Sequence, residues 1–205
     1  MKKVISVFLI ISFIFGFSVR ANTAFYDLST HSWAAASIYR LADKGVIQGI
    51  APHYYAPGNY VSKAQLCTLL NRMFGIGGNG LSAFPDVPEN SYYYESVAGL
   101  KALGILTTTD GMFHPDDAVN REETMRITGF LLQRFGFVSY SDESCLERFA
   151  DRDLISPENR QYTALLISKG YITGDDTGNL NPDGYLTRAE IAVLLDRMYS
   201  DIMQE

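Results

Sequence analysis

Three positively charged side chains stand at matching places in the sequence, each directly after a residue that can cap a helix. They are Lys63, Arg121 and Arg188. At the first turn of a helix, unpaired backbone N–H groups and the helix dipole favour an anion. An arginine there can also hold a carboxylate with two parallel hydrogen bonds, whereas lysine is a point charge. The pattern predicts anion binding, with a weaker or different site at Lys63.

A helix is expected to begin at each of these three cations. The preceding residues are Ser62, Asn120 and Thr187, and each is followed three positions later by a residue that completes a capping box. We interpret those later residues as caps rather than ligand contacts; they are Gln65, Glu123 and Glu190. Apolar residues then recur at helical spacing, which favours an amphipathic helix in each case.

These helices belong to a pattern that is written three times along the chain. Four motifs recur in the same order in each copy. They are a Phe-x-Asp motif, a glycine turn, an aromatic or leucine residue two positions before a proline, and the capping box. From the glycine to the residue before the cap there are 16, 15 and 16 positions, for Gly45–Val61, Gly104–Val119 and Gly170–Leu186. The sequence therefore predicts three helix-loop-helix repeats, over 25–75, 84–136 and 149–200, and an all-α fold.

One repeat of about 50 residues buries too little surface to be stable alone. We therefore expect residues 22–205 to form one cooperative unit, with the second helix of each repeat in a central bundle. Residues 1–21 are predicted to be a secretory signal peptide, because Lys2 and Lys3 precede an apolar run and Val19 and Ala21 suit the −3 and −1 positions of a cleavage site. A retained N-terminal anchor is the alternative. The net charge of −6 argues against nucleic-acid binding.

The motifs together resemble the S-layer homology (SLH) domain. The similarity rests on the opening Phe-x-Asp, Trp33 in the first helix, Gly-x-x-x-Gly, the aromatic-x-Pro motif and Thr-Arg-Ala-Glu at 187–190, and it covers residues 25 to 200. It implies a pseudo-threefold arrangement of the repeats and a secreted, non-catalytic module at the bacterial cell wall. It also implies a partner, an anionic and often pyruvylated secondary cell-wall polysaccharide bound in grooves between repeats; another surface protein is a further candidate.

The resemblance and the residue chemistry together give a set of candidate ligand-binding residues besides the three cations. Trp33 and Tyr92 offer flat faces for a sugar ring. The turn glycines would let the backbone approach a ligand; they are Gly45, Gly104 and Gly170. The aspartates of the Phe-x-Asp motifs could contact ligand or brace a loop; they are Asp27, Asp86 and Asp151. Because Glu158 replaces the aromatic residue in the third repeat, at most two grooves look well equipped.

Other functions compete with this interpretation. Residues 179–190 resemble a calcium loop, whose ligands would be Asn179, Asn181, Asp183 and Glu190. Against this, Pro182 lies inside the loop and the other repeats lack the pattern. A secreted helical scaffold for protein–protein interaction is a further alternative. No catalytic motif joins the three histidines to a nucleophile, so we expect neither an enzyme nor a cofactor.

Overall fold

The computed structural model describes residues 24–138 and 142–202, and the predicted signal peptide lies outside these ranges. Within them the protein is helical and contains no β-sheet, as the sequence predicts. Four short 3-10 turns accompany the α-helices: η1 (Ser29–His31), η2 (Glu143–Leu146), η3 (Arg152–Leu154) and η4 (Pro157–Asn159).

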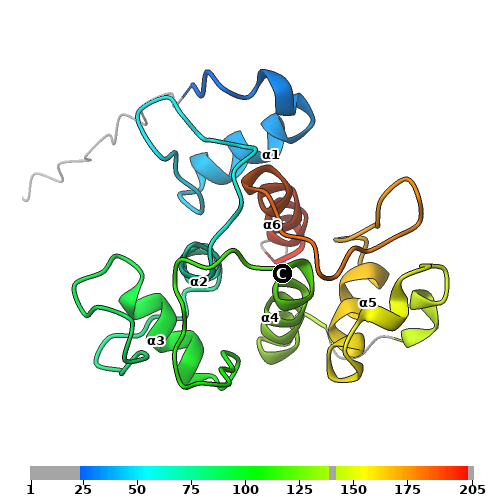
Figure 1. Ribbon diagram of the computed structural model, residues 1–205. Coiled ribbons are helices and arrows are strands. Elements are labelled where there is room, and N and C mark those ends of the chain that lie inside the picture. The colour runs from blue at the N-terminus through cyan, green and yellow to red at the C-terminus, as the bar shows by residue number, and fades with distance from the viewer. Residues whose placement is uncertain (1–23, 139–141, 203–205) are drawn as a thin grey trace, which may run out of the picture.

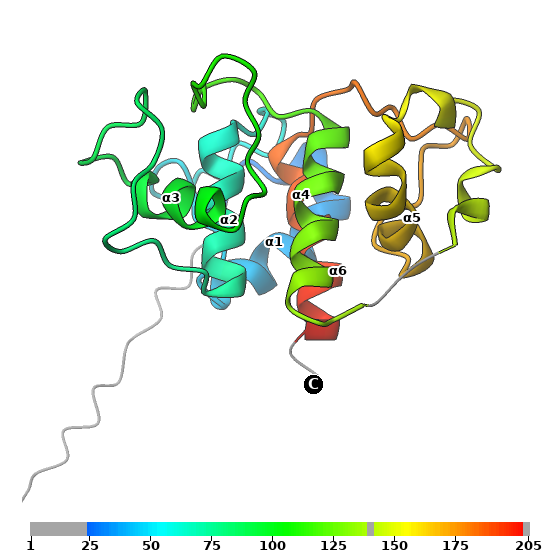
Figure 2. The ribbon, with the colours of Figure 1, turned by 90° about the horizontal axis from the view of Figure 1, so that it is seen from below.

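The second helices of the three repeats form the centre of the molecule. They are α2 (Lys63–Phe74), α4 (Arg121–Arg134) and α6 (Arg188–Ile202). They stand side by side around an approximate threefold axis, and three outer helices surround them (Figures 1 and 2). The outer helices are α1 (Ser32–Asp43), α3 (Tyr94–Ala102) and α5 (Arg160–Ser168).

Each outer helix packs against a central helix of a different repeat. Helix α3 lies on α2, α5 lies on α4, and α1 lies on α6 (Figure 1). The outer helix of one repeat thus covers the central helix of the repeat before it. The α1–α6 contact joins the first and last α-helices of the described residues and closes the ring. Each repeat therefore packs on the next one, and the cooperative folding of residues 22–205 stays a prediction.

The central helices begin in a cyclic arrangement of backbone hydrogen bonds at one end of the bundle. The first N–H of α2 donates to Asp117 O at 2.9 Å, that of α4 to Gly184 O at 2.8 Å, and that of α6 to Asn59 O at 2.8 Å. The second N–H of each helix donates to the carbonyl of a loop proline, and the third to the cap side chain. These N–H groups are occupied within the fold, so they are not available to an anion as the sequence suggested.

The three contacts between outer and central helices use different chemistry at equivalent positions. In the α1–α6 contact, Ser37 Oγ donates to the buried Asp196 carboxylate at 2.8 Å, and Arg40 also donates to it. In the α2–α3 contact, Asn71 Nδ2 donates to Ser96 Oγ at 3.1 Å. In the α4–α5 contact a glycine, Gly129, makes room for a tyrosine. These differences favour one order of helices around the ring over the others.

We expect Asp196→Asn to lower the free energy of unfolding by about 1.5 kcal/mol at pH 7, because the carboxylate loses its charge-assisted bonds. Burial alone would raise the pKa of Asp196, but the hydrogen bonds from Arg40 and Ser37 outweigh burial and lower it. A lowered folded-state pKa stabilises the protein above the unfolded-state value, near 3.8, and that stabilisation is lost as the pH falls through the folded-state value.

The measurement is urea unfolding of the wild type and the variant at pH 7 and at pH 3. The difference between them should shrink at the lower pH. Asp153→Asn is the matched control, because Asp153 is exposed and forms only long surface ion pairs. A difference of equal size at both pH values would show that the charge of Asp196 does not stabilise the α1–α6 contact.

Candidate ligand-binding groove between the repeats

A groove of about 340 Å³ lies where all three repeats meet. Trp33 of the first repeat, Arg121 of the second and the loop of the third repeat form its walls, and α6 forms its floor. Of the predicted saccharide-binding residues, this groove brings together Trp33 and Arg121, and two residues of the alternative calcium loop, Asn181 and Glu190, line it as well. Its remaining lining includes Thr173, Gly174, Asp175 and Arg197.

Trp33 lies at the groove with its side chain largely in solvent. It is 58% exposed, although a single tryptophan in a domain of this size usually belongs to the core. Its face is therefore accessible to a sugar ring. Tyr92, the equivalent residue of the second repeat, is 68% exposed and lines a separate hollow of about 280 Å³ together with Arg72.

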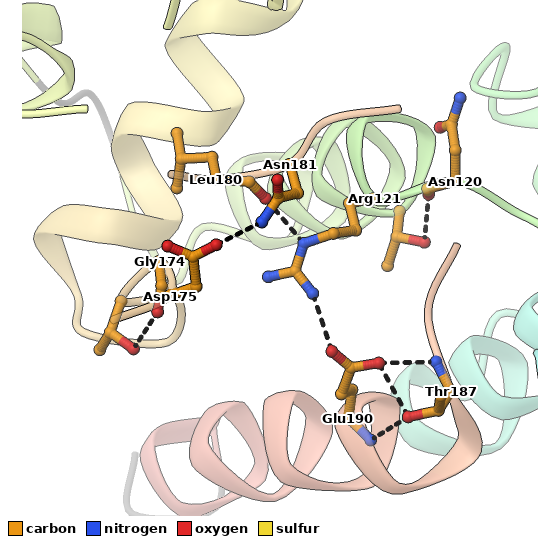
Figure 3. A network of polar contacts seen from close by, with 10 residues as sticks. Asn120, Arg121, Gly174, Asp175, Leu180, Asn181, Thr187 and Glu190 are labelled. Atoms are coloured by element: carbon orange, nitrogen blue, oxygen red, sulfur yellow. Dashed lines mark hydrogen bonds and ion pairs between the residues drawn. The ribbon is translucent and has the colours of Figure 1, made fainter. Parts of the chain in front are cut away.

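Arg121 is held in place by the third repeat, as Figure 3 shows. Its Nε donates to Leu180 O at 2.8 Å and its Nη1 to Glu190 Oε1 at 3.2 Å. Among the described residues, its Nη2 forms no hydrogen bond. The side chain is 20% exposed. Arg121 is thus fixed by two bonds and keeps donor capacity at the groove.

Arg197 is a second cation of the groove. The sequence analysis did not predict it, because it does not lie beside a helix cap. It extends from α6, and its Nη1 donates to Tyr171 O at 2.9 Å. Arg72 occupies the same place in α2, nine residues after the cation that starts the helix. The Arg-Met pairs at 72–73 and 197–198 are the sequence signal that could have revealed both residues.

The acidic residues of the groove are engaged in hydrogen bonds inside the protein. Glu190 Oε2 accepts from the backbone N–H and the hydroxyl of Thr187, both at 2.8 Å. Asp175 accepts from the backbone of Asn179, from Thr177 and from the Asn181 amide, which lowers its pKa far below the usual range. Asp175 therefore organises the loop of the third repeat that forms one wall of the groove. Like Arg197, it was not among the residues predicted from the sequence.

Three of the four candidate ligands of the alternative calcium loop, Asn179, Asn181 and Glu190, take part in the same network. The Asn181 amide donates to Asp175, the Asn179 amide donates to Thr177, and Glu190 bonds Arg121 and caps α6. In 24–138 and 142–202, no group of three or more His, Cys, Asp or Glu side chains is placed to hold a metal ion.

Arg188 is buried between α6 and the first repeat, with 8% of its surface exposed. Its Nε donates to Tyr55 O and its Nη2 to Gln48 O, both at 2.8 Å. Its guanidinium lies over the Tyr55 ring, 4.5 Å from the centroid. In both Arg188 and Arg121, Nε donates to a backbone carbonyl in a loop of another repeat. Unlike that of Arg121, however, the guanidinium of Arg188 is surrounded by protein. Arg188 therefore holds two repeats together.

Lys63 lies apart from the groove, with its Nζ 3.9 Å from the exposed carboxylate of Asp117. The three predicted cations thus differ in environment although they share one position in the repeat. A long surface ion pair of this kind contributes little to stability.

The aspartates of the Phe-x-Asp motifs hold loop backbone. The Asp27 carboxylate accepts from the N–H groups of Tyr55 and Ala56, and Asp86 and Asp151 do the same in their own repeats. Burial alone would raise the pKa of Asp27 and of Asp86, but these bonds outweigh burial and lower both. None of the three lines the groove.

The turn glycines end the outer helices. Gly45, Gly104 and Gly170 have φ of +74°, +75° and +72°, a conformation that glycine adopts without strain. A close approach of the backbone to a neighbouring side chain occurs instead at Gly174, four residues after the turn glycine Gly170. At Gly174, which lines the groove, an added Cβ would lie 2.6 Å from the Phe149 ring. The contact of the three turn glycines with ligand stays a prediction.

The fold and this groove define a class of protein: a ring of three helical repeats with a hollow at a junction, lined by two arginines, two acidic residues and a tryptophan. The family model of the S-layer homology domain matches residues 24–67, 83–125 and 148–192. The chain therefore belongs to the SLH family, as the sequence motifs predict. The SLH domain is a non-catalytic anchoring module, and membership indicates a secreted protein at the bacterial cell surface.

Several relatives support this location. The chain is 28% identical over 83% of its length to the surface-layer 125 kDa protein of Lysinibacillus sphaericus, and 26% identical over 96% to a cell surface protein of Thermoanaerobacter kivui. It is 21% identical over 74% to a cellulosome-anchoring protein of Acetivibrio thermocellus. The matched regions cover 14%, 24% and 34% of those proteins. None of the helices described is long and apolar enough to cross a membrane.

Proposed function

We propose that this chain attaches non-covalently to the bacterial cell wall by binding an anionic secondary polysaccharide, with pyruvylated sugars as the leading case. Catalysis has no part in this function. The observation that carries it is the groove in which Arg121 and Arg197 keep donors beside the exposed face of Trp33.

The groove fits an acidic sugar for electrostatic and geometric reasons. Guanidinium groups form charge-assisted, often bidentate bonds with carboxylates. An indole face packs on the apolar side of a sugar ring while its edge remains polar. The chain as a whole is negative, but charges beyond a Debye length of about 8 Å are largely screened. The two carboxylates in the groove, Asp175 and Glu190, already accept hydrogen bonds from the protein, so the groups left to meet a ligand are the arginine donors, which prefer an anion.

The test is co-sedimentation of the purified chain with cell-wall sacculi that carry pyruvylated secondary polysaccharide. A matched batch is stripped of that polymer with hydrofluoric acid, which leaves the peptidoglycan. We expect the protein to sediment with the intact sacculi and to stay in solution with the stripped ones. Equal retention on both batches would contradict binding to the polysaccharide and would favour a protein or peptidoglycan partner.

A further inference from the structure

The hollow that Tyr92 and Arg72 line is a different kind of site from the groove. We call it the second hollow; it lies between α2 and the segment that leads into α3. Among the described residues, no cation at a helix start lines it, and no residue of the loop 45–56 does. The groove has both features, from Arg121 and from the loop of the third repeat. The counterpart of Arg121 at this junction is the buried Arg188, so the second hollow lacks the helix-start guanidinium that the groove offers to an acid.

The charged groups of the second hollow suit hydrogen-bond donors better than an anion. Glu89 and Glu95 supply two exposed carboxylates, and neither carboxylate forms a hydrogen bond or ion pair within the described part of the chain. Arg72 is the one cation of the described lining, and its Nη2 donates to Gln48 Oε1 at 3.4 Å. In the groove, by contrast, the carboxylates are engaged and arginine donors are left over. Free carboxylates accept hydrogen bonds from sugar hydroxyls and repel another carboxylate.

Tyr92 gives the second hollow an open aromatic face. It occupies the place of Trp33 in the second repeat, and 68% of its surface is exposed. The Tyr93 ring meets it edge-on, with the ring centroids 5.0 Å apart and an angle of 88° between the planes. Such an edge-to-face contact favours one orientation of the exposed ring. The face of Tyr92 can therefore pack on the C–H side of a sugar while the carboxylates receive its hydroxyls.

Ser91 supplies an unpaired polar group in the same wall. Its Oγ is buried and has no hydrogen-bond partner among the described residues, although Ser91 lines the second hollow. Buried hydroxyls are normally paired with protein or with an ordered water molecule. A polar ligand atom next to Ser91 would therefore satisfy a group that the fold itself leaves open.

The chemistry of the second hollow is particular to the second repeat. Glu89 and Glu95 stand where the first repeat has Thr30 and Ala36. In the third repeat, Glu158 replaces the aromatic residue that forms the open face. All these positions are exposed, so the packing of the outer helices does not account for the differences.

We propose that the second hollow binds an uncharged sugar of the wall polymer and excludes the pyruvylated one, so that the chain has two saccharide sites of different specificity. This inference rests on the proposed function. An uncharged ring brings hydroxyl donors to Glu89 and Glu95 and a C–H face to Tyr92. A pyruvyl carboxylate would instead meet two free carboxylates with a single arginine nearby. A wall polymer that carries both kinds of sugar then offers a ligand to each site.

The experiment compares one polymer with and without its acidic groups. Pyruvylated secondary polysaccharide is released from sacculi, half of it is depyruvylated with mild acid, and both halves are titrated into the protein by calorimetry. We expect Tyr92→Ala to weaken binding of the depyruvylated polymer about tenfold, or about 1.4 kcal/mol. Trp33→Ala should weaken the intact polymer instead and change the affinity for the depyruvylated one by less than about twofold. Tyr26→Ala is the control, since Tyr26 is exposed and lines neither site.

A further variant and a modified polymer test the chemistry of the site. Tyr92→Phe keeps the ring and should bind the depyruvylated polymer within about threefold of the wild type. The inference is overturned if the wild type binds only the intact polymer, or if a folded Tyr92→Ala variant keeps full affinity for the depyruvylated one. Loss of binding after N-acetylation of the depyruvylated polymer would also overturn it, because the ligand would then be an ammonium group. If removal of the pyruvyl groups leaves the affinity of the wild type unchanged, the proposed role of the groove fails instead.

Discussion

Arg188→Ala is expected to lower the free energy of unfolding by about 3 kcal/mol. The substitution removes two hydrogen bonds to the carbonyls of Tyr55 and Gln48 and a guanidinium that lies over the Tyr55 ring. Because Arg188 is buried, the two carbonyls would lose a charged donor without ready replacement by water. The melting temperature should fall by about 6–12 °C for a chain of this size.

The measurement is thermal and urea unfolding followed by far-ultraviolet circular dichroism. Lys63→Ala is the matched control, because Lys63 starts α2 as Arg188 starts α6 but forms only a long ion pair with Asp117. We expect the control to change the stability by less than about 0.5 kcal/mol. If the two variants were equally stable, the buried guanidinium would not be what joins α6 to the first repeat.

Arg121→Ala combined with Arg197→Ala is expected to weaken binding of a short pyruvylated probe, methyl 4,6-O-pyruvyl-glucopyranoside, about a hundredfold. Each arginine is expected to supply one charge-assisted contact to the carboxylate, and two contacts of about 1.5 kcal/mol give about 3 kcal/mol. Both arginines also brace loop carbonyls, so the variant must first be shown to fold by its circular dichroism and its melting temperature.

The control for this prediction removes the same charge elsewhere. Arg134→Ala combined with Arg148→Ala takes two exposed arginines away from positions that do not line the groove. We expect its affinity to remain within about twofold of the wild type, because long-range effects of exposed charges are screened at physiological salt. A folded groove variant with unchanged affinity would show that these guanidinium groups do not contact the ligand.

The sequence by itself determined the helices and the repeat pattern. A cap such as Ser62 or Thr187 acts on N–H groups within one turn, and the apolar spacing that follows is also local, so both can be read along the chain. The three-repeat pattern and the all-α fold therefore followed without coordinates. The cations at the helix starts were located correctly, and Arg121 does line the groove.

The tertiary structure alone decided which of these residues can meet a ligand. Arg121 and Arg188 have the same local sequence setting, but one reaches the groove and the other is buried against Tyr55. The difference comes from partners 59 to 140 residues away, such as Leu180 for Arg121 and Gln48 for Arg188. Arg197 bonds to Tyr171 within its own repeat, and the packing of α1 on α6 brings Trp33 of the first repeat to the same groove. Local periodicity carries no information about such distant partners, because the packing of the closed ring selects them.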